Sequence, residues 1–148
     1  MDNINIAIIV AEFYKPITES LLDGAVDVFQ KAGLTRENYS IYRVSGAYEV
    51  PQLANKLLDE HGLDGILCLG CIIRGETPHF DIVANESARG IMNVSLEHSV
   101  PVTNGILTTE NKEQAIARTT GDKGNKGAEC ATTLLEMCNL FDKIDYGE

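Results

Sequence analysis

Strand-like segments alternate with segments of helical periodicity along this chain, and that alternation is what most limits the folds it can adopt. Ile4–Ala11 and Gly65–Leu69 are nearly continuous apolar runs, whereas Tyr39–Ser45 and Val102–Leu107 are weaker strand candidates. Continuous apolar runs of this length are typical of parallel strands that are covered on both faces. The sequence therefore predicts a parallel sheet buried between helices.

Apolar residues at helical spacing follow each predicted strand. The first helix is expected to begin near Thr18 or Glu19 and to stop at Gly33. The others cover Val50–His61, Phe80–His98, a short stretch after Thr109, and residues 131–141. The order βαβαβαβαα, with right-handed crossovers, predicts an α/β fold: a three-layer α/β/α sandwich around a four-stranded parallel sheet, in a single domain over residues 1–148.

The charge balance excludes some classes of partner. The chain has 12 Lys and Arg against 22 Asp and Glu, a net charge of −10. Binding to nucleic acid or to an anionic membrane surface requires a surplus of basic residues, so neither is expected. No apolar run approaches the ~20 residues that span a bilayer. A small anionic ligand is still compatible with this charge if a helix N-terminus or a few basic residues receive it.

The cysteines and the first residues indicate the cellular compartment. Asp2 and no basic residue precede the first apolar run, which indicates a buried strand and not a secretory signal, so we expect a cytoplasmic protein with reduced thiols. Cys68 and Cys71 form a CxxC pair, but positions three apart in a strand face opposite ways. Cys130 and Cys138 do not complete a zinc motif. We therefore predict buried structural thiols and no metal site.

Ligands of parallel α/β sheets bind beyond the carboxyl ends of the strands, which directs attention to the loops after residues 11, 45, 70 and 107. Phe13 in the first loop can stack on a planar ligand or cover the core. In the second loop, Gly46 and Ala47 allow close approach of a ligand to the backbone. Glu49 can accept bonds from hydroxyl groups or simply favour the start of a helix.

The third and fourth loops carry candidates for anion binding and proton transfer. Glu76 and Thr77 precede a helix that starts near His79, so their backbone N–H groups form a potential anion site. The positive end of that helix favours a neutral His79 imidazole, which is suited to proton transfer. Arg118 and Lys126 lie in the densest basic stretch, which either grips a phosphate or is a solvated loop. Neither a Walker motif nor GxGxxG occurs in the sequence.

Four segments, in this order, resemble the lumazine synthase family: GAYEVP at 46–51, GCIIRGETPHFDIV at 70–83, GILTTENKEQAIAR at 105–118 and GNKGAE at 124–129. The resemblance extends over nearly the whole chain and implies a flavodoxin-like topology. It also implies the penultimate reaction of riboflavin biosynthesis. In that reaction, 5-amino-6-ribitylaminopyrimidinedione and 3,4-dihydroxy-2-butanone 4-phosphate condense to 6,7-dimethyl-8-ribityllumazine, phosphate and water. The family uses no metal or organic cofactor.

The resemblance also implies a role for each candidate residue. It assigns proton transfer to His79 and the butanone phosphate to Glu76, Thr77 and Arg118. It assigns the pyrimidine and its ribityl chain to Phe13, Ala47, Tyr48, Glu49, Cys71, Ile72, Ile73 and Lys126, with the backbone of residues 71–73 along the polar edge of the ring. Asn104 stands where the family usually has a bulky apolar residue that packs on the heterocycle from a neighbouring subunit. Weaker binding of the pyrimidine is therefore expected.

The resemblance further implies a homopentamer, and in some members twelve pentamers form a hollow shell. The compact GDKGNKG turn favours the shell, whereas the start of the chain close to its first core strand, without an N-terminal arm, argues against it. Two other functions stay open from the sequence. One is a flavin- or nucleotide-binding module with the same topology, although its first loop should be rich in Ser and Thr. The other is a diverged, inactive paralogue that forms a shell or binds a flavin ligand.

Overall fold

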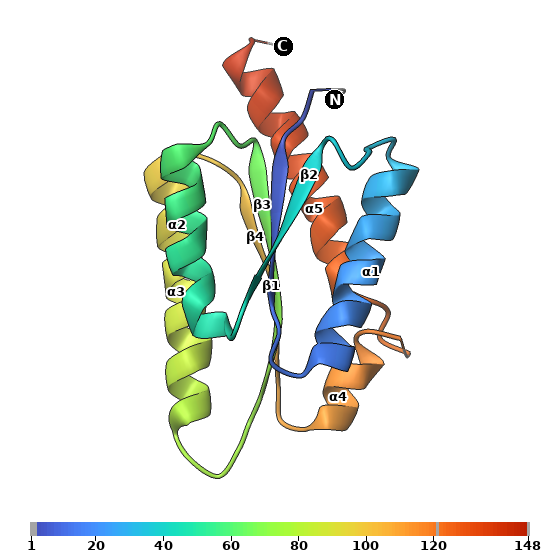
Figure 1. The fold of residues 1–148 in the computed structure, drawn as a ribbon, viewed down its shortest axis with the longest axis vertical. Coiled ribbons are helices and arrows are strands. Elements are labelled where there is room, and N and C mark those ends of the chain that lie inside the picture. Colours follow the sequence, from blue (N-terminus) through green and yellow to red (C-terminus); the bar gives the residue numbers. More distant parts are fainter. Residues whose placement is uncertain (1–2, 121, 148) are drawn as a thin grey trace.

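The computed structural model describes residues 3–120 and 122–147; Asp2 and Gly121, which entered the expectations above, lie outside this part. Within it, four strands form one parallel sheet in the order β2-β1-β3-β4 (Figure 1). The strands are β1 Ile6–Ala11, β2 Tyr39–Val44, β3 Gly65–Ile73 and β4 Val102–Thr109. The chain reverses its direction of progress across the sheet between β1 and β3, which is where doubly wound sheets form ligand sites.

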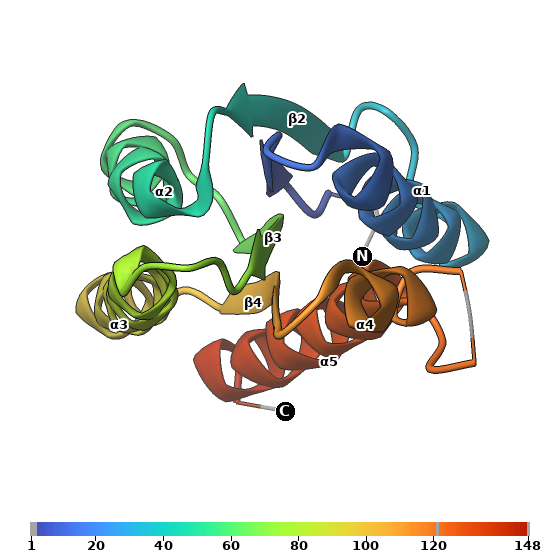
Figure 2. The ribbon, with the colours of Figure 1, turned by 90° about the horizontal axis from the view of Figure 1, so that it is seen from below.

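Helices cover both faces of the sheet. They are α1 Lys15–Lys31, the short 3₁₀ helix η1 Ala47–Glu49, α2 Val50–Glu60, α3 His79–His98, α4 Lys112–Ala117 and α5 Lys126–Asp145. Seen from below in Figure 2, α2 and α3 lie on one side of the sheet, whereas α1, α4 and α5 lie on the other. The predicted three-layer α/β/α sandwich is therefore confirmed.

Alternating side chains of the central strands fill two separate cores. In β1 every residue is buried, and Ile8 lies opposite Ile41 of β2 and Leu67 of β3. Ile8 belongs to the core beneath α1 and α5, whereas its neighbour Ile9 belongs to the core beneath α2 and α3. This two-sided burial explains why the central strands read as continuous apolar runs and not as alternating ones.

Several element boundaries differ from the sequence expectation, and those of α1 and β3 differ for clear structural reasons. Helix α1 begins at Lys15, one turn before the predicted start, because Tyr14 adopts a left-handed conformation (φ 62°) and Pro16 suits a first turn. Thr18 is therefore buried inside the helix, where its hydroxyl donates to the Lys15 carbonyl at 3.2 Å. Strand β3 continues past the predicted end at Leu69, since residues 70–73 still pair with β4.

The start of α5 is fixed against α1 by two residues. Asn125 caps α5 by accepting from the Ala128 N–H at 3.0 Å, and its amide donates to the Ser20 carbonyl at 2.9 Å. A Cβ added to Gly127 would lie 2.0 Å from the Leu21 carbonyl oxygen, so only glycine allows this approach of the two helices. Asn125 and Gly127 flank Lys126 in the sequence, so these contacts also fix the backbone of Lys126 beside α1.

The cysteines are structural, as predicted. Cys68 faces the core beneath α2 and α3, whereas Cys71 faces the core beneath α1 and α5. All four cysteines are buried free thiols. Burial raises the pKa of Cys71 to about 11 and that of Cys138 to about 12, so both are protonated and unreactive at neutral pH. No helix in the described residues has the length and hydropathy needed to cross a membrane.

Candidate active site

A cavity of about 560 Å³ opens at the carboxyl ends of β1 and β3. Its lining comes from three loops and the first turns of α3: Phe13, Tyr14, Gly46, Ala47, Tyr48, Glu49, Cys71, Ile72, Ile73, Gly75, Thr77, His79, Phe80, Ile82 and Val83. Most of the residues proposed from the sequence thus meet in one place. The position between β1 and β3 is the one that the strand order favours for a ligand.

The first wall of the cavity presents an exposed aromatic ring. Phe13 is 65% exposed and packs edge-to-face on Tyr14, with ring centroids 4.8 Å apart. The left-handed Tyr14 turns the chain sharply into α1, while the Phe13 N–H donates to the Ser45 carbonyl at 3.2 Å. The loop that carries Phe13 is therefore tied to the loop after β2, and the ring is available for stacking on a planar ligand.

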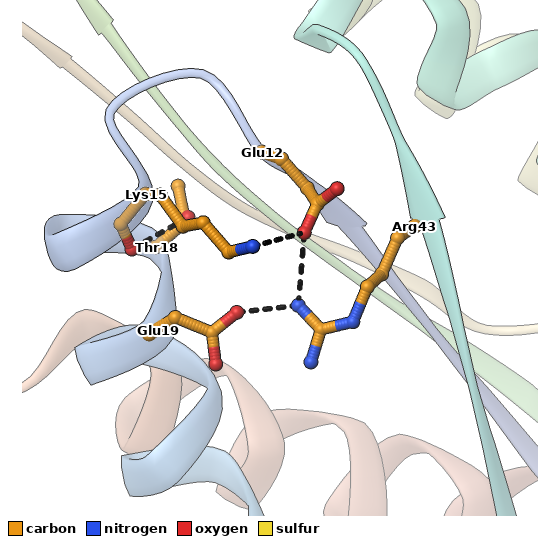
Figure 3. A network of polar contacts seen from close by, with 5 residues as sticks. All are labelled: Glu12, Lys15, Thr18, Glu19 and Arg43. Atoms are coloured by element: carbon orange, nitrogen blue, oxygen red, sulfur yellow. Dashed lines mark hydrogen bonds and ion pairs between the residues drawn. The ribbon is translucent and has the colours of Figure 1, made fainter.

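A network of charged side chains holds this loop from behind (Figure 3). A guanidinium nitrogen of Arg43, on β2, bonds Glu12 at 3.2 Å and also contacts Glu19 of α1. Lys15 lies 3.7 Å from the same Glu12 carboxylate. The hydrogen bonds that Arg43 donates, first to Glu19 and then to Glu12, raise the pKa of Arg43. It links β2, α1 and the loop that carries Phe13.

The second wall is η1, the single turn that joins β2 to α2. Ala47 is buried against the core, whereas Tyr48 and Glu49 are exposed towards solvent and line the cavity. The Glu49 N–H donates to the Gly46 carbonyl at 3.2 Å, which closes the turn. An exposed carboxylate at this position can accept several hydroxyl groups of a polyol.

The third wall is the turn before α3 together with the first residue of that helix. His79 is exposed, lines the cavity and opens α3, while its N–H donates to the Thr77 hydroxyl oxygen at 3.4 Å. Among the described residues, the backbone N–H groups of Glu76 and Thr77 have no acceptor. These groups can receive an anion at the positive end of α3, beside an imidazole that can carry a proton.

The floor and back of the cavity are mainly apolar. The floor is formed by the last three residues of β3, Cys71, Ile72 and Ile73, since this strand continues beyond Leu69. Ile82 and Val83 were not proposed from the sequence, although they lie three and four residues after His79 and so on the same face of α3. Helical spacing counted from His79 would have identified both.

Four proposed residues do not line the cavity. Glu76 lies in the turn between two lining residues, Gly75 and Thr77. The other three are Asn104 on β4, Arg118 at the end of α4 and Lys126 at the start of α5, and we call these three residues the second patch. The Lys126 N–H donates to the Arg118 carbonyl at 2.8 Å. One helical turn after Lys126, the Cys130 thiol contacts the Asn104 carbonyl at 3.6 Å.

The side chains of the second patch are only partly engaged. Asn104 is exposed on the edge strand β4, and its side-chain oxygen accepts from the Ile106 N–H at 3.0 Å. Arg118 is half-buried and donates to the Gln114 carbonyl at 2.8 Å. The residues that line the cavity include no Lys or Arg, so Arg118 and Lys126 lie outside the lining of the site that would receive an anion.

The groups at the cavity determine which kind of ligand it can bind. It combines an aromatic face, a carboxylate, free backbone N–H groups and one imidazole. Such a set can hold a planar heterocycle with a hydroxylated chain next to an anionic group. In the described part of the chain, no three His, Cys, Asp or Glu side chains are grouped so that they could hold a metal ion.

Comparisons with known proteins agree on one family. A family model described as 6,7-dimethyl-8-ribityllumazine synthase matches residues 3–142. A protein of that name from Desulfotalea psychrophila is 48% identical over 143 residues, which cover 97% of this chain and 92% of the relative. A protein of the same name from Campylobacter jejuni subsp. doylei is 49% identical over 142 residues, which cover 96% of this chain and 92% of the relative. Another from Pediococcus pentosaceus is 46% identical over 142 residues, which cover 96% of this chain and 91% of the relative.

Proposed function

The chain belongs to the 6,7-dimethyl-8-ribityllumazine synthase family, and on that basis we propose which of its residues carry out the family's reaction. It is a transferase of riboflavin biosynthesis that acts on small-molecule substrates. We propose that these are the ribitylaminopyrimidinedione and the butanone phosphate implied by the sequence motifs. The cavity carries this proposal because three adjacent loops bring together a stacking ring, a hydroxyl acceptor, an anion-binding turn and a histidine.

The pyrimidine binds against Phe13, with its polar edge along the backbone of residues 71–73 and its ribityl chain over η1. Glu49 accepts hydroxyl groups of that chain. Stacking on an exposed ring contributes ~0.5–1.5 kcal/mol beyond the burial of area. The ion-pair network behind Phe13 supports this role, since it restricts the loop before any ligand arrives.

The butanone phosphate binds with its phosphate at the N–H groups of Glu76 and Thr77. The amine of the first substrate attacks the ketone carbon of the second, so no protein nucleophile is required. His79 transfers protons during this addition and the following loss of water, which contributes on the order of 10²–10⁴ in rate. Phosphate leaves by elimination, and Arg118 together with the N-terminus of α3 stabilises the developing charge. The ribitylamino nitrogen of the first substrate then attacks the adjacent carbonyl carbon, and loss of a second water closes the ring.

The site is completed by a second copy of the chain. The phosphate needs a basic side chain, the cavity lining has none, and the second patch holds Arg118 and Lys126 elsewhere on the same chain. When one surface of a protein binds a different surface of the next copy, the contacts can close into a ring. We propose a homopentamer of this kind, which can also assemble into a shell, in the cytoplasm. Four free thiols fit a reducing compartment.

The test is to mix the two purified substrates with the protein and to follow lumazine absorbance and phosphate release. Turnover above the uncatalysed rate is expected; its absence would favour a diverged paralogue that only binds flavin-like ligands. His79→Ala should slow turnover with little change in affinity for a phosphate ligand. Arg118→Ala should mainly weaken that affinity, by roughly 1.5–3 kcal/mol. Arg36→Ala is the control, because Arg36 stacks on Tyr39, the first residue of β2, at the other end of the sheet.

Light scattering and electron microscopy test the assembly state directly. A ring of five copies supports the proposed contact between cavity and second patch, and a monomer that turns over at the full rate contradicts it.

A further inference from the structure

Arg74 lies between two cavity-lining residues, Ile73 and Gly75, yet its own side chain does not line the cavity. Its Nε donates to a Glu110 carboxylate oxygen at 2.6 Å. Its Nη1 lies 3.4 Å from the Asp81 carboxylate. An arginine beside an anion-binding turn would be expected to bind the phosphate, but this one is already paired with two carboxylates.

The guanidinium is also stacked on an aromatic ring. Its central carbon lies 4.3 Å from the centroid of the Phe80 ring. Phe80 and Asp81 directly follow His79 in the first turn of α3, so Arg74 contacts that turn both by stacking and by an ion pair. A planar guanidinium can make both contacts at once, whereas a lysine ammonium cannot.

The contact between Arg74 and Glu110 anchors this arrangement to the sheet. Glu110 follows β4 directly, and the Arg74 N–H donates to the Thr109 carbonyl at 2.9 Å. The side chain thus joins the end of β3, the loop after β4 and the first turn of α3. The hydrogen bonds that Arg74 donates to Glu110 and Asp81 raise the pKa of Arg74, because both carboxylates favour the charged guanidinium.

The first turn of α3 needs such an anchor. Its N-cap position is Pro78, which offers no capping side chain, and the Thr77 hydroxyl accepts from the His79 N–H only at 3.4 Å. A weakly capped helix start frays more easily, and His79 is the first residue of the helix. General acid–base catalysis depends on geometry, and a misplacement of about 1 Å can lower the rate by about 10²-fold.

We propose that Arg74 is a positioning residue that holds the first turn of α3, and with it His79, in the orientation required for proton transfer. The inference rests on the proposed role of His79. It differs from a role in phosphate binding, because Arg74 acts through Phe80, Asp81 and Glu110 and not on the substrate.

The test compares Arg74→Met and Arg74→Lys in the parent protein and in a His79→Ala background. In the parent, both substitutions should lower kcat by about 5- to 20-fold, within the range that a general acid–base contributes, and leave both KM values within about twofold. In the His79→Ala background, the same substitutions should change kcat by less than about twofold, since residues that act as one unit are not additive. Arg36→Met is the matched control, because Arg36 also stacks on an aromatic ring, that of Tyr39, but lies at the other end of the sheet from the cavity.

Asp81→Asn and Glu110→Gln each remove one arm of the contact and leave the stacking on Phe80 in place. They should also lower kcat, and they replace Arg74→Met in the test if that variant does not fold. Thermal melting of each variant shows whether the fold is retained.

Three results would overturn the proposal. The first is an unchanged kcat in the folded Arg74 variants. The second is a raised KM for the butanone phosphate that Arg74→Lys restores, which would make Arg74 a phosphate ligand. The third is an equal loss of kcat with and without His79. A parent protein without turnover, or an unaffected His79→Ala variant, would instead contradict the proposed function.

Discussion

Two impaired variants of this protein should restore activity when they assemble together, because the assembly proposed above places the cavity and the second patch of each site on different copies. His79→Ala damages the cavity and leaves Arg118 intact. Arg118→Ala damages the second patch and leaves His79 intact. In an oligomer that contains both variants, some contacts join an intact cavity to an intact second patch.

The expected recovery follows from the arrangement of the two groups. In a random equal mixture, about half of the cavities and about half of the second patches are intact, so about one quarter of the sites combine both when each contact joins two different surfaces. Removal of a general acid–base lowers the rate by at least about 10²-fold, so the His79→Ala oligomer alone should retain about 1% of the parent activity or less. At a butanone phosphate concentration well below the parent KM, the Arg118→Ala oligomer alone is also slow, because its affinity for the phosphate falls by roughly 1.5–3 kcal/mol. Under that condition the mixed oligomer should reach roughly a quarter of the parent rate.

The assay requires co-expression of the two variants with different affinity tags, purification through both tags, and measurement of phosphate release. Separately purified variants that are combined without exchange of subunits provide the control. If the doubly purified oligomer shows only the average of the two single-variant rates, then each chain builds its own complete site and the division described here is wrong.

Three further predictions concern packing, affinity and pH. Gly127→Ala should destabilise the protein by about 3 kcal/mol in urea unfolding, the upper end of the range for overpacking, because the new Cβ would overlap the Leu21 carbonyl. The control is Gly62→Ala, because a Cβ at Gly62 would meet nothing within 4 Å. Asn104→Phe should tighten pyrimidine binding by ~0.5–1.5 kcal/mol in a direct titration, and no tightening would refute the role of this position. The pKa of Cys71 is about 11 in the folded protein against the usual 9.0, so the unfolded chain loses this proton first and stability falls as the pH rises between these values. Cys71→Ala should reduce that loss.

The sequence predicted the layers of the fold because the signals for them are local. The apolar run of β1 and the helical stripe of α5 each depend on neighbours a few residues away. Boundaries were less certain where a single backbone conformation decided them. Tyr14 in a left-handed conformation moved the start of α1 to Lys15, and pairing with β4 extended β3 to Ile73.

Candidate site residues could be found from the sequence where they stand next to a turn or at a helix start, as Phe13, Glu49 and His79 do. Ile82 and Val83 gave no separate signal, because an apolar pair on a helix reads as core until the cavity is known. The ion pair between Arg74 and Glu110 could not be predicted either, since the two residues are 36 positions apart along the chain.

The sequence by itself determined the class of fold, the loops that carry polar residues and, through several motifs in fixed order, the family. Only the tertiary structure decided that β1 lies between β2 and β3, so that three loops meet at one cavity. It also separated Arg118 and Lys126 from that cavity. The physical reason is that motifs and periodicity record contacts with near neighbours, whereas strand order and the packing of α5 on α1 join residues that lie far apart in the chain.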